Sequence, residues 1–149
     1  MAVLREHPYG RFNFLVDLGT GNTEGPDGGF QACSPIGMEI AVVEYRNGND
    51  RENAPRKLPG LTKVPDVTLK RGIIGSLSLF EWTRTVRDGT VERRSVTIQL
   101  IAEDRSGAVL TWRLLRAFPV KYTAGPLNAQ ANEVAIEELT LSAERLELE

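Results

Sequence analysis

The sequence is poor in the two residue types that most often carry metal sites and nucleophilic catalysis. Its 149 residues include one cysteine, Cys33, and one histidine, His7. A lone cysteine gives neither a disulfide framework nor a thiolate metal cluster within one chain, and we interpret Cys33 as a small strand residue. His7 precedes Pro8 near the N-terminus, which gives little support to a Ser-His-Asp or Cys-His arrangement. We therefore expect no metal site, no cofactor and no enzymatic activity.

Long hydrophobic runs are also missing. No stretch approaches the ~20 apolar residues that a membrane-spanning helix needs, and residues 1–10 lack the apolar core of a secretory signal. We expect no membrane span and no classical export. The remaining composition, 41% hydrophobic and 26% charged, is typical of a globular chain with a moderate core. No internal repeat or low-complexity segment is visible, so the sequence predicts a single domain over residues 1–149.

Other signals of catalysis or nucleotide binding are weak. Adjacent acids such as Glu137 and Glu138 would project to opposite faces of a strand, so they cannot share one reaction centre. The glycine-rich residues 19–21 follow a strand pattern, but neither the helix nor the lysine of a phosphate loop comes after them. Tyr45 is the only aromatic residue between positions 43 and 71, whereas proteins that bind single-stranded nucleic acid stack bases on several rings.

Alternation of apolar and polar residues with a period of two dominates the sequence and predicts strands. The expected strands cover residues 12–18, 30–34, 38–46, 66–71, 95–103, 108–116 and 134–146. The phase shifts by one at Arg116 before the alternation continues through Tyr122, which predicts a β-bulge in one long strand. Turn residues at 19–29, 104–107 and 125–128 predict the connecting loops. Regularly spaced short strands of this kind favour an antiparallel β-barrel or sandwich.

One segment, residues 74–86, predicts a helix, although residues 77–79 also fit a strand. Leu79, Trp82, Thr83 and Val86 fall on one stripe of a helix of 3.6 residues per turn. Ser76 is a candidate for the N-terminal cap, and the Asp88-Gly89 pair is a candidate for the end of the helix. Trp82 and the strand residue Trp112 are interpreted as core anchors rather than ligand platforms.

The stretch between the strands at 38–46 and 66–71 is long, polar and strongly charged. Insertions of this length within a compact domain are usually functional or disordered. Residues 46–71 hold seven basic and three acidic residues, while residues 133–149 hold six glutamates against one arginine. We predict that residues 47–63 form a long extended loop that acts as an assembly arm; the alternative is a solvated charged loop without a partner. The candidate arm residues are Arg46, Asn47, Asp50, Arg51, Arg56, Lys57, Leu58 and Lys63. The opposite charge of the C-terminal segment permits either a pairing within one chain or a head-to-tail contact between copies. For a contact between copies, Glu138, Glu144 and Glu147 are the candidates for an acidic counter-surface of the arm.

Several segments at ordered spacing carry a family resemblance. They are HPYGRFNF at residues 7–14, the arm itself, GSLSLFEW at 75–82, AFPVK at 117–121 and NEVAIEELTL at 132–141. On these segments the sequence resembles, along nearly its whole length, the tail-tube (inner tube) proteins of contractile phage tails and of extracellular contractile injection systems. The resemblance implies a β-barrel flanked by one α-helix, a fold shared with the type VI secretion tube protein.

The same resemblance implies a structural role. Proteins of this kind form hexameric rings that stack into a hollow tube inside a sheath, assembled in the bacterial cytoplasm as part of a virion or contractile particle. The expected partners are further copies of the chain, the sheath protein, baseplate and spike hub proteins, and a luminal cargo of effector protein or phage DNA. The alternative is a baseplate or spike-adaptor protein of the same fold that starts the tube.

Overall fold

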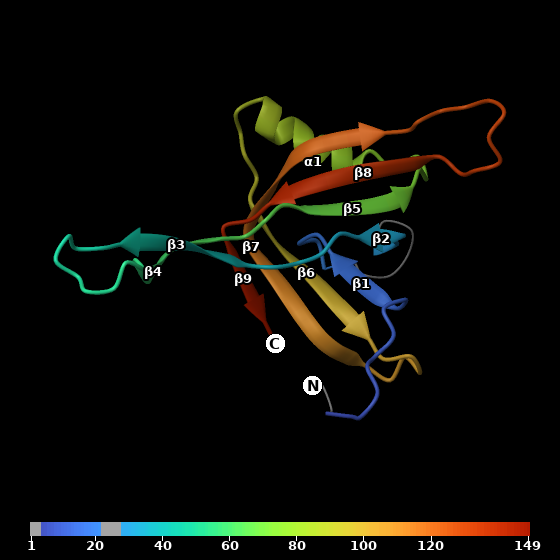
Figure 1. The fold of residues 1–149 in the computed structure, drawn as a ribbon. Coiled ribbons are helices and arrows are strands. Elements are labelled where there is room, and N and C mark those ends of the chain that lie inside the picture. Colours follow the sequence, from blue (N-terminus) through green and yellow to red (C-terminus); the bar gives the residue numbers. More distant parts are fainter. Residues whose placement is uncertain (1–3, 22–27) are drawn as a thin grey trace.

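The structure is a computed structural model that describes residues 4–21 and 28–149. The described part of the chain forms nine strands and one helix, which gather around a single core except for β3 and β4 (Figure 1). The elements are β1 (Phe14–Asp17), β2 (Ala32–Cys33), β3 (Glu39–Tyr45), β4 (Arg56–Lys63), β5 (Val67–Gly72), α1 (Ser78–Arg87), β6 (Arg94–Ile101), β7 (Ala108–Ala124), β8 (Ile136–Ser142) and β9 (Arg145–Leu148).

The long strand β7 joins the two halves of the main sheet, whose order is β1-β6-β7-β8-β5-β2. The first half of β7 pairs with β6 and β9, and its second half pairs with β8, always antiparallel. At the junction, Leu115 and Arg116 lie opposite the single residue Ser95, and Arg116 has a φ of 54°. This bulge lets the sheet bend over itself, because an extra residue on one strand increases its local twist.

The core lies between the two halves of the bent sheet and α1. Val16, Ile98 and Leu114 enter it from one half, and Leu69 and Leu139 from the other. The helix contributes its two buried residues, Leu79 and Trp82, and the Trp82 indole nitrogen donates a 2.7 Å hydrogen bond to the carbonyl oxygen of Glu92. Trp112 packs against the periphery of the same core. Two residues of the predicted amphipathic stripe of α1, Leu79 and Trp82, are therefore buried against the core.

A buried ion pair joins the neighbouring strands β5 and β8, where Arg71 and Glu137 lie directly opposite each other. The Arg71 Nε atom donates a 2.7 Å hydrogen bond to one oxygen of Glu137, and the Tyr122 hydroxyl donates a 2.5 Å bond to the other. The Arg71 guanidinium also lies 3.4 Å from the hydroxyl of Ser78 at the start of α1. These contacts join β5, β7, β8 and α1. The hydrogen bond to Glu137, together with burial, raises the pKa of Tyr122 to about 12.

Strands β3 and β4 form a separate two-stranded hairpin that projects from the body of the molecule (Figure 1). Its register runs from Tyr45 opposite Arg56 to Glu39 opposite Lys63, with an irregularity between Ile40 and Val42. The prediction of an extended loop over 47–63 was therefore correct only for residues 47–55, since β4 occupies the rest. The polar residues near position 50 favoured a loop over the whole stretch, although the residues from Leu58 to Lys63 lie in the strand that pairs with β3.

Most other predicted elements are present with shifted ends. The bulge near Arg116 and the turn after β6 are confirmed. The strand predicted over 134–146 is wrong as one piece, because β8 and β9 are separated where they follow the bend of β7. The helix begins at Ser78 instead of Ile74. Ser76 is not its cap residue, although its hydroxyl accepts a 3.3 Å bond from the Ser78 amide. Part of the loop predicted at 19–29 lies outside the described residues.

Candidate assembly surface

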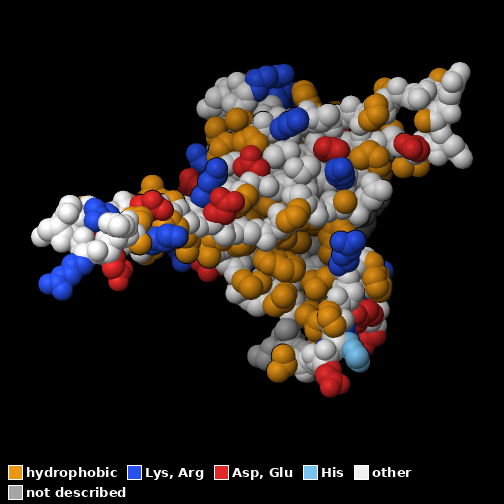
Figure 2. All heavy atoms as spheres, in the orientation of Figure 1, with side chains coloured by type: hydrophobic (Ala, Val, Ile, Leu, Met, Phe, Trp, Pro, Cys, Tyr) orange, Lys and Arg blue, Asp and Glu red, His pale blue; other side chains and the backbone are white. Residues whose placement is uncertain are grey.

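The hairpin of β3 and β4, here called the arm, exposes large apolar side chains among charged ones and has no core of its own. Every residue of both strands is exposed. The large exposed apolar side chains are Met38, Ile40, Val42, Val43, Tyr45, Leu58 and Leu61. Figure 2 shows hydrophobic side chains along the arm, mixed with charged ones. An isolated two-stranded hairpin is at best marginally stable in water, so these residues point to a partner that covers them.

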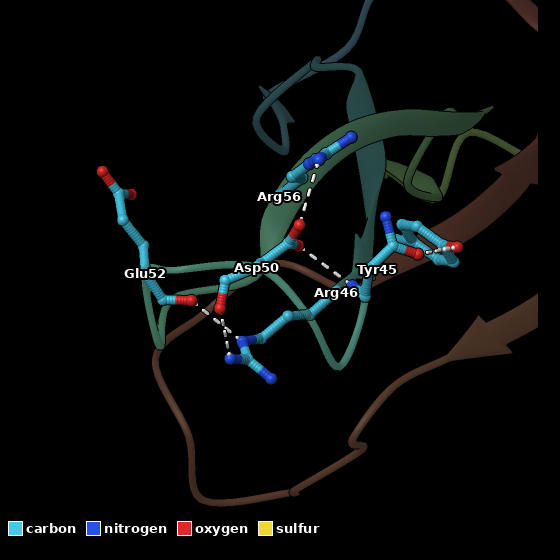
Figure 3. A network of polar contacts seen from close by, with 6 residues as sticks. Tyr45, Arg46, Asp50, Glu52 and Arg56 are labelled. Carbon is cyan, nitrogen blue, oxygen red and sulfur yellow. Dashed lines mark hydrogen bonds and ion pairs between the residues drawn. The ribbon is translucent and has the colours of Figure 1, made fainter.

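The loop that closes the arm is held by a local polar network (Figure 3). Arg46 donates to the carbonyl oxygens of Asp50 and Glu52 at 3.1 and 3.0 Å. The Asp50 carboxylate accepts a 3.0 Å bond from the Asn47 amide and a 3.3 Å bond from Arg56. The Tyr45 hydroxyl donates to the Asn47 side chain at 2.5 Å. The candidate residues Arg46, Asn47, Asp50 and Arg56 are thus brought together by the arm to shape its own tip.

The remaining basic residues of the arm stand beside acids of the same hairpin. Lys57 lies directly opposite Glu44, and Lys63 lies opposite Glu39. Directly opposed residues on antiparallel strands interact through their side chains. Arg51 is exposed in the tip loop. The positive charge that the sequence places on this segment is therefore largely balanced within the hairpin.

The three candidate acids of the counter-surface also have partners on their own chain. Glu138 forms a 3.4 Å ion pair with Lys70. Glu144 contacts both Arg93 and Arg116, and Glu147 contacts its neighbour Arg145. Glu144 and Glu147 lie in a shallow pocket together with Met38, at the root of the arm. An ion pair with another copy would have to replace these contacts.

Three strands of the main sheet offer a free edge. Among the described strands, β1, β2 and β9 each pair on one side only. In β9, Glu149 exchanges both backbone hydrogen bonds with Thr111, so the amides and carbonyls of Leu146 and Leu148 point away from β7. Unpaired strand edges of this kind are templates for a strand from another chain.

The chemistry of a metal centre or a nucleophile is not assembled by these elements. The described residues contain no group of three or more His, Cys, Asp or Glu side chains placed to hold a metal ion. Burial raises the pKa of the Cys33 thiol to about 11, so it is protonated at neutral pH. No helix among the described residues has the length and apolarity to cross a membrane.

Comparison with known proteins assigns the chain to a family. The family model described as the T4-like virus tail tube protein gp19 matches residues 10–147. The chain belongs to this family. A search of curated protein sequences finds no match.

Solved structures of tail-tube relatives agree over almost the whole chain. The structure is similar to a chain of the sheath-tube complex of an extracellular contractile injection system, PVC, in its extended state. The TM-score is 0.83 at 28% identity, with 97% of this chain and 93% of that chain covered. A chain of the tube-terminating cap of the anti-feeding prophage matches with a TM-score of 0.84 at 27% identity, with 100% and 95% covered. Hcp1 from Flavobacterium johnsoniae matches with a TM-score of 0.55 at 15% identity, covering 91% of this chain and 93% of that chain, which shows the shared fold alone.

The structure also has a second exposed apolar surface, which was not predicted from the sequence. It consists of Ile73, Ile74, Leu77, Leu127 and Val134, here called the distal patch. Its two segments are joined where the Ile73 amide donates a 2.9 Å hydrogen bond to the carbonyl oxygen of Ala135. Leu127 and Val134 lie in the β7–β8 loop, and the other three residues lie in the segment between β5 and α1. Figure 1 shows the β7–β8 loop on the opposite side of the molecule from the arm. The sequence signal that could have revealed it is the near-absence of charged residues from both segments.

Proposed function

We propose that this chain is the repeating subunit of the inner tube of a contractile, phage-tail-like injection particle. The observation that carries the proposal is the arm, a projecting hairpin with many exposed apolar side chains and no core of its own. Such a surface is a liability in a free monomer and is explained by burial against a neighbour. Family membership and the match to the PVC sheath-tube complex support the same role. The role requires no covalent chemistry from any residue.

In this proposal, copies close into hexameric rings by continuing their sheets through the free strand edges. Joining these edges removes unpaired backbone groups that would otherwise promote disordered aggregation. The rings then stack through a contact between two different surfaces, which propagates as a filament because it cannot close on itself. The arm, residues 47–63 with the strand β3 before it, supplies one of these surfaces.

The proposed surroundings extend those of the relatives, whose structures include a sheath-tube complex and a baseplate. A sheath protein encloses the tube, baseplate and spike hub proteins start it, and the lumen holds an effector protein or phage DNA. Assembly takes place in the bacterial cytoplasm before the particle is used or released.

A second candidate is a protein of the same fold that starts or ends the tube. Matches to a tube-terminating cap, a sheath/tube terminator and a baseplate have TM-scores of 0.82 to 0.84, like the match to the sheath-tube complex. Structural similarity alone therefore favours neither. Long stacked tubes in electron micrographs of the purified protein support the tube subunit, whereas single capped rings support the end protein.

The arm gives the first test. We expect that replacing residues 47–63 with a short Gly-Ser turn leaves the main sheet folded, because closing a surface loop of different length has a small free-energy cost. Tube formation should fail, since the docking strand is gone. Circular dichroism reports the fold and negative-stain electron microscopy reports the tubes. Normal tubes from this variant would contradict the role of the arm.

A further inference from the structure

The distal patch is unusually poor in charge. Its two segments, residues 72–77 and 124–135, make up 18 residues and contain a single ionisable side chain, Glu133. The average of the whole chain, 26% charged, would place about five there, and depletion of charge is the compositional mark of an interface core. Leu127 and Val134 are 83% and 76% exposed. This surface is therefore both apolar and uncovered in the single chain.

The distal patch and the arm lie on opposite sides of the molecule, as a head-to-tail contact requires. The arm leaves one side of the molecule, and the β7–β8 loop, which carries Leu127 and Val134, projects from the opposite side (Figure 1). A contact that repeats head to tail needs two different complementary surfaces, one on each side of the subunit. The arm and the distal patch are two exposed apolar surfaces placed in this way.

The chemistry of the two surfaces is also compatible. The arm presents Val42, Val43 and Leu61 to solvent. Its strand lysines, Lys57 and Lys63, stand opposite Glu44 and Glu39 of the same hairpin. A largely uncharged partner surface leaves those in-chain pairs intact and removes apolar area from water on both sides. An acidic partner surface would instead compete with them.

We propose that the distal patch of one copy receives the apolar arm of the next copy. The inference rests on the proposed function, because it names the surface that the assembly arm of a tube subunit contacts. The occupant is a second copy of this chain, and the contact is formed by Leu127, Val134 and the neighbouring Ile73, Ile74 and Leu77.

The first experiment introduces charge into the patch. We expect Leu127→Arg with Val134→Arg to raise the critical concentration for tube or ring formation by at least about tenfold, because both arginines would be buried without a partner. The matched control is Leu4→Arg with Val91→Arg, the same two changes at exposed positions outside the patch, which should assemble like the natural chain. Sedimentation and electron microscopy measure assembly, and circular dichroism verifies the fold.

The second experiment locates the contact. Leu61→Cys on the arm and Leu127→Cys in the patch, combined in one chain, should give covalent multimers with a short bis-maleimide in assembled material. Each single variant should give no such ladder, since Cys33 is half-buried and its pKa is raised to about 11.

The outcomes separate the two proposals. If the natural chain assembles and the patch double variant assembles equally well, the patch is not the receiving surface and the tube role stands. An assembled double-cysteine chain that gives no ladder has the same meaning. If the natural chain forms neither rings nor tubes even when preformed tube ends are supplied, the tube role itself is overturned, and the inference falls with it.

Discussion

The ion pair between Arg71 and Glu137 is the most consequential contact at the scale of single residues. Both side chains are almost completely buried, at 1% and 3% exposure, and the Tyr122 hydroxyl occupies the second oxygen of the carboxylate. A buried pair contributes little relative to well-packed apolar residues, but removal of one partner leaves a buried charge without compensation. The network therefore makes the packing of α1 and three strands mutually dependent.

Substitution of Arg71 tests this dependence. We expect Arg71→Met to lower the free energy of unfolding by about 3–5 kcal/mol, because the Glu137 carboxylate stays buried without its cation. Chemical denaturation with urea measures the change. As a control, Lys70→Met on the same strand removes only the exposed pair with Glu138 and should cost about 0–1 kcal/mol. Equal effects of the two substitutions would show that the buried pair has no special role.

The Tyr122 phenol gives a prediction for alkaline pH. Its pKa in the folded chain is about 12, above the value of about 10 for an unfolded tyrosine. The folded state therefore holds this proton more tightly, and its stabilising contribution is complete below pH 10 and is lost as the pH rises towards 12. We expect the difference in unfolding free energy between the natural chain and Tyr122→Phe to shrink over this interval. Urea denaturation of both proteins at pH 9 and pH 11 checks it, and a constant difference would contradict the assigned hydrogen bond.

At the scale of elements, the arm depends on one glycine of β4. A Cβ atom added at Gly60 would lie 3.0 Å from the carbonyl oxygen of Ala41 and 3.2 Å from a methyl group of Val43. This close approach lies at the register irregularity of the hairpin. Gly60 therefore permits the two strands of the arm to pass each other where the ladder shifts, as glycine does at irregular strand positions.

Replacement of Gly60 should separate assembly from folding. We expect Gly60→Val to disturb the arm and impair tube formation, while the unfolding free energy of the body changes by less than about 0.5 kcal/mol, since the arm shares no core with it. Gly48→Val is the matched control, because a Cβ at Gly48 meets no atom within 4 Å. A large loss of stability in Gly60→Val, or normal tubes, would count against this division of roles.

The elements also show how far the sequence could be interpreted. Alternation identified the main strands, and the phase shift at Arg116 identified the bulge, because both depend on local side-chain periodicity. The continuation of β4 was missed since Pro59 and Gly60 look like turn residues, and their place in a ladder depends on β3. The distal patch was missed because it joins two segments that are about fifty residues apart along the chain and meet only after β5 pairs with β8.

At the scale of the whole molecule, charge is mostly balanced within the chain and apolar surface is not. The arm basics stand beside arm acids, and Glu138, Glu144 and Glu147 have in-chain partners. The predicted pairing of the arm with these acids on another copy stays a prediction. An exchange of one exposed ion pair for another brings little net free energy, so we assign most of the subunit contact to apolar burial.

A salt titration distinguishes the two contributions. We expect tubes of the natural chain to persist when the salt concentration is raised from 0.1 M to 1 M, because burial of apolar surface is not screened. A contact carried by exposed ion pairs would weaken instead, since the screening length falls from ~10 Å to ~3 Å over this range. Light scattering follows the tubes. Two results together would show that the arm contacts the acidic counter-surface of another copy. They are dissolution of the tubes at 1 M salt and failed assembly of the Arg56→Glu, Lys57→Glu double variant at low salt.

The hairpin without a core has a consequence for how a tube begins. Two free subunits that meet must each hold a marginal hairpin in place while they bury only one arm between them. A subunit that joins an existing ring meets several prepared surfaces at once, so addition to an end is favoured over spontaneous initiation. The number of tubes is then set by the number of initiating complexes, and free subunits stay unassembled until such a complex is present. Preformed ends added to purified subunits should abolish the lag before growth.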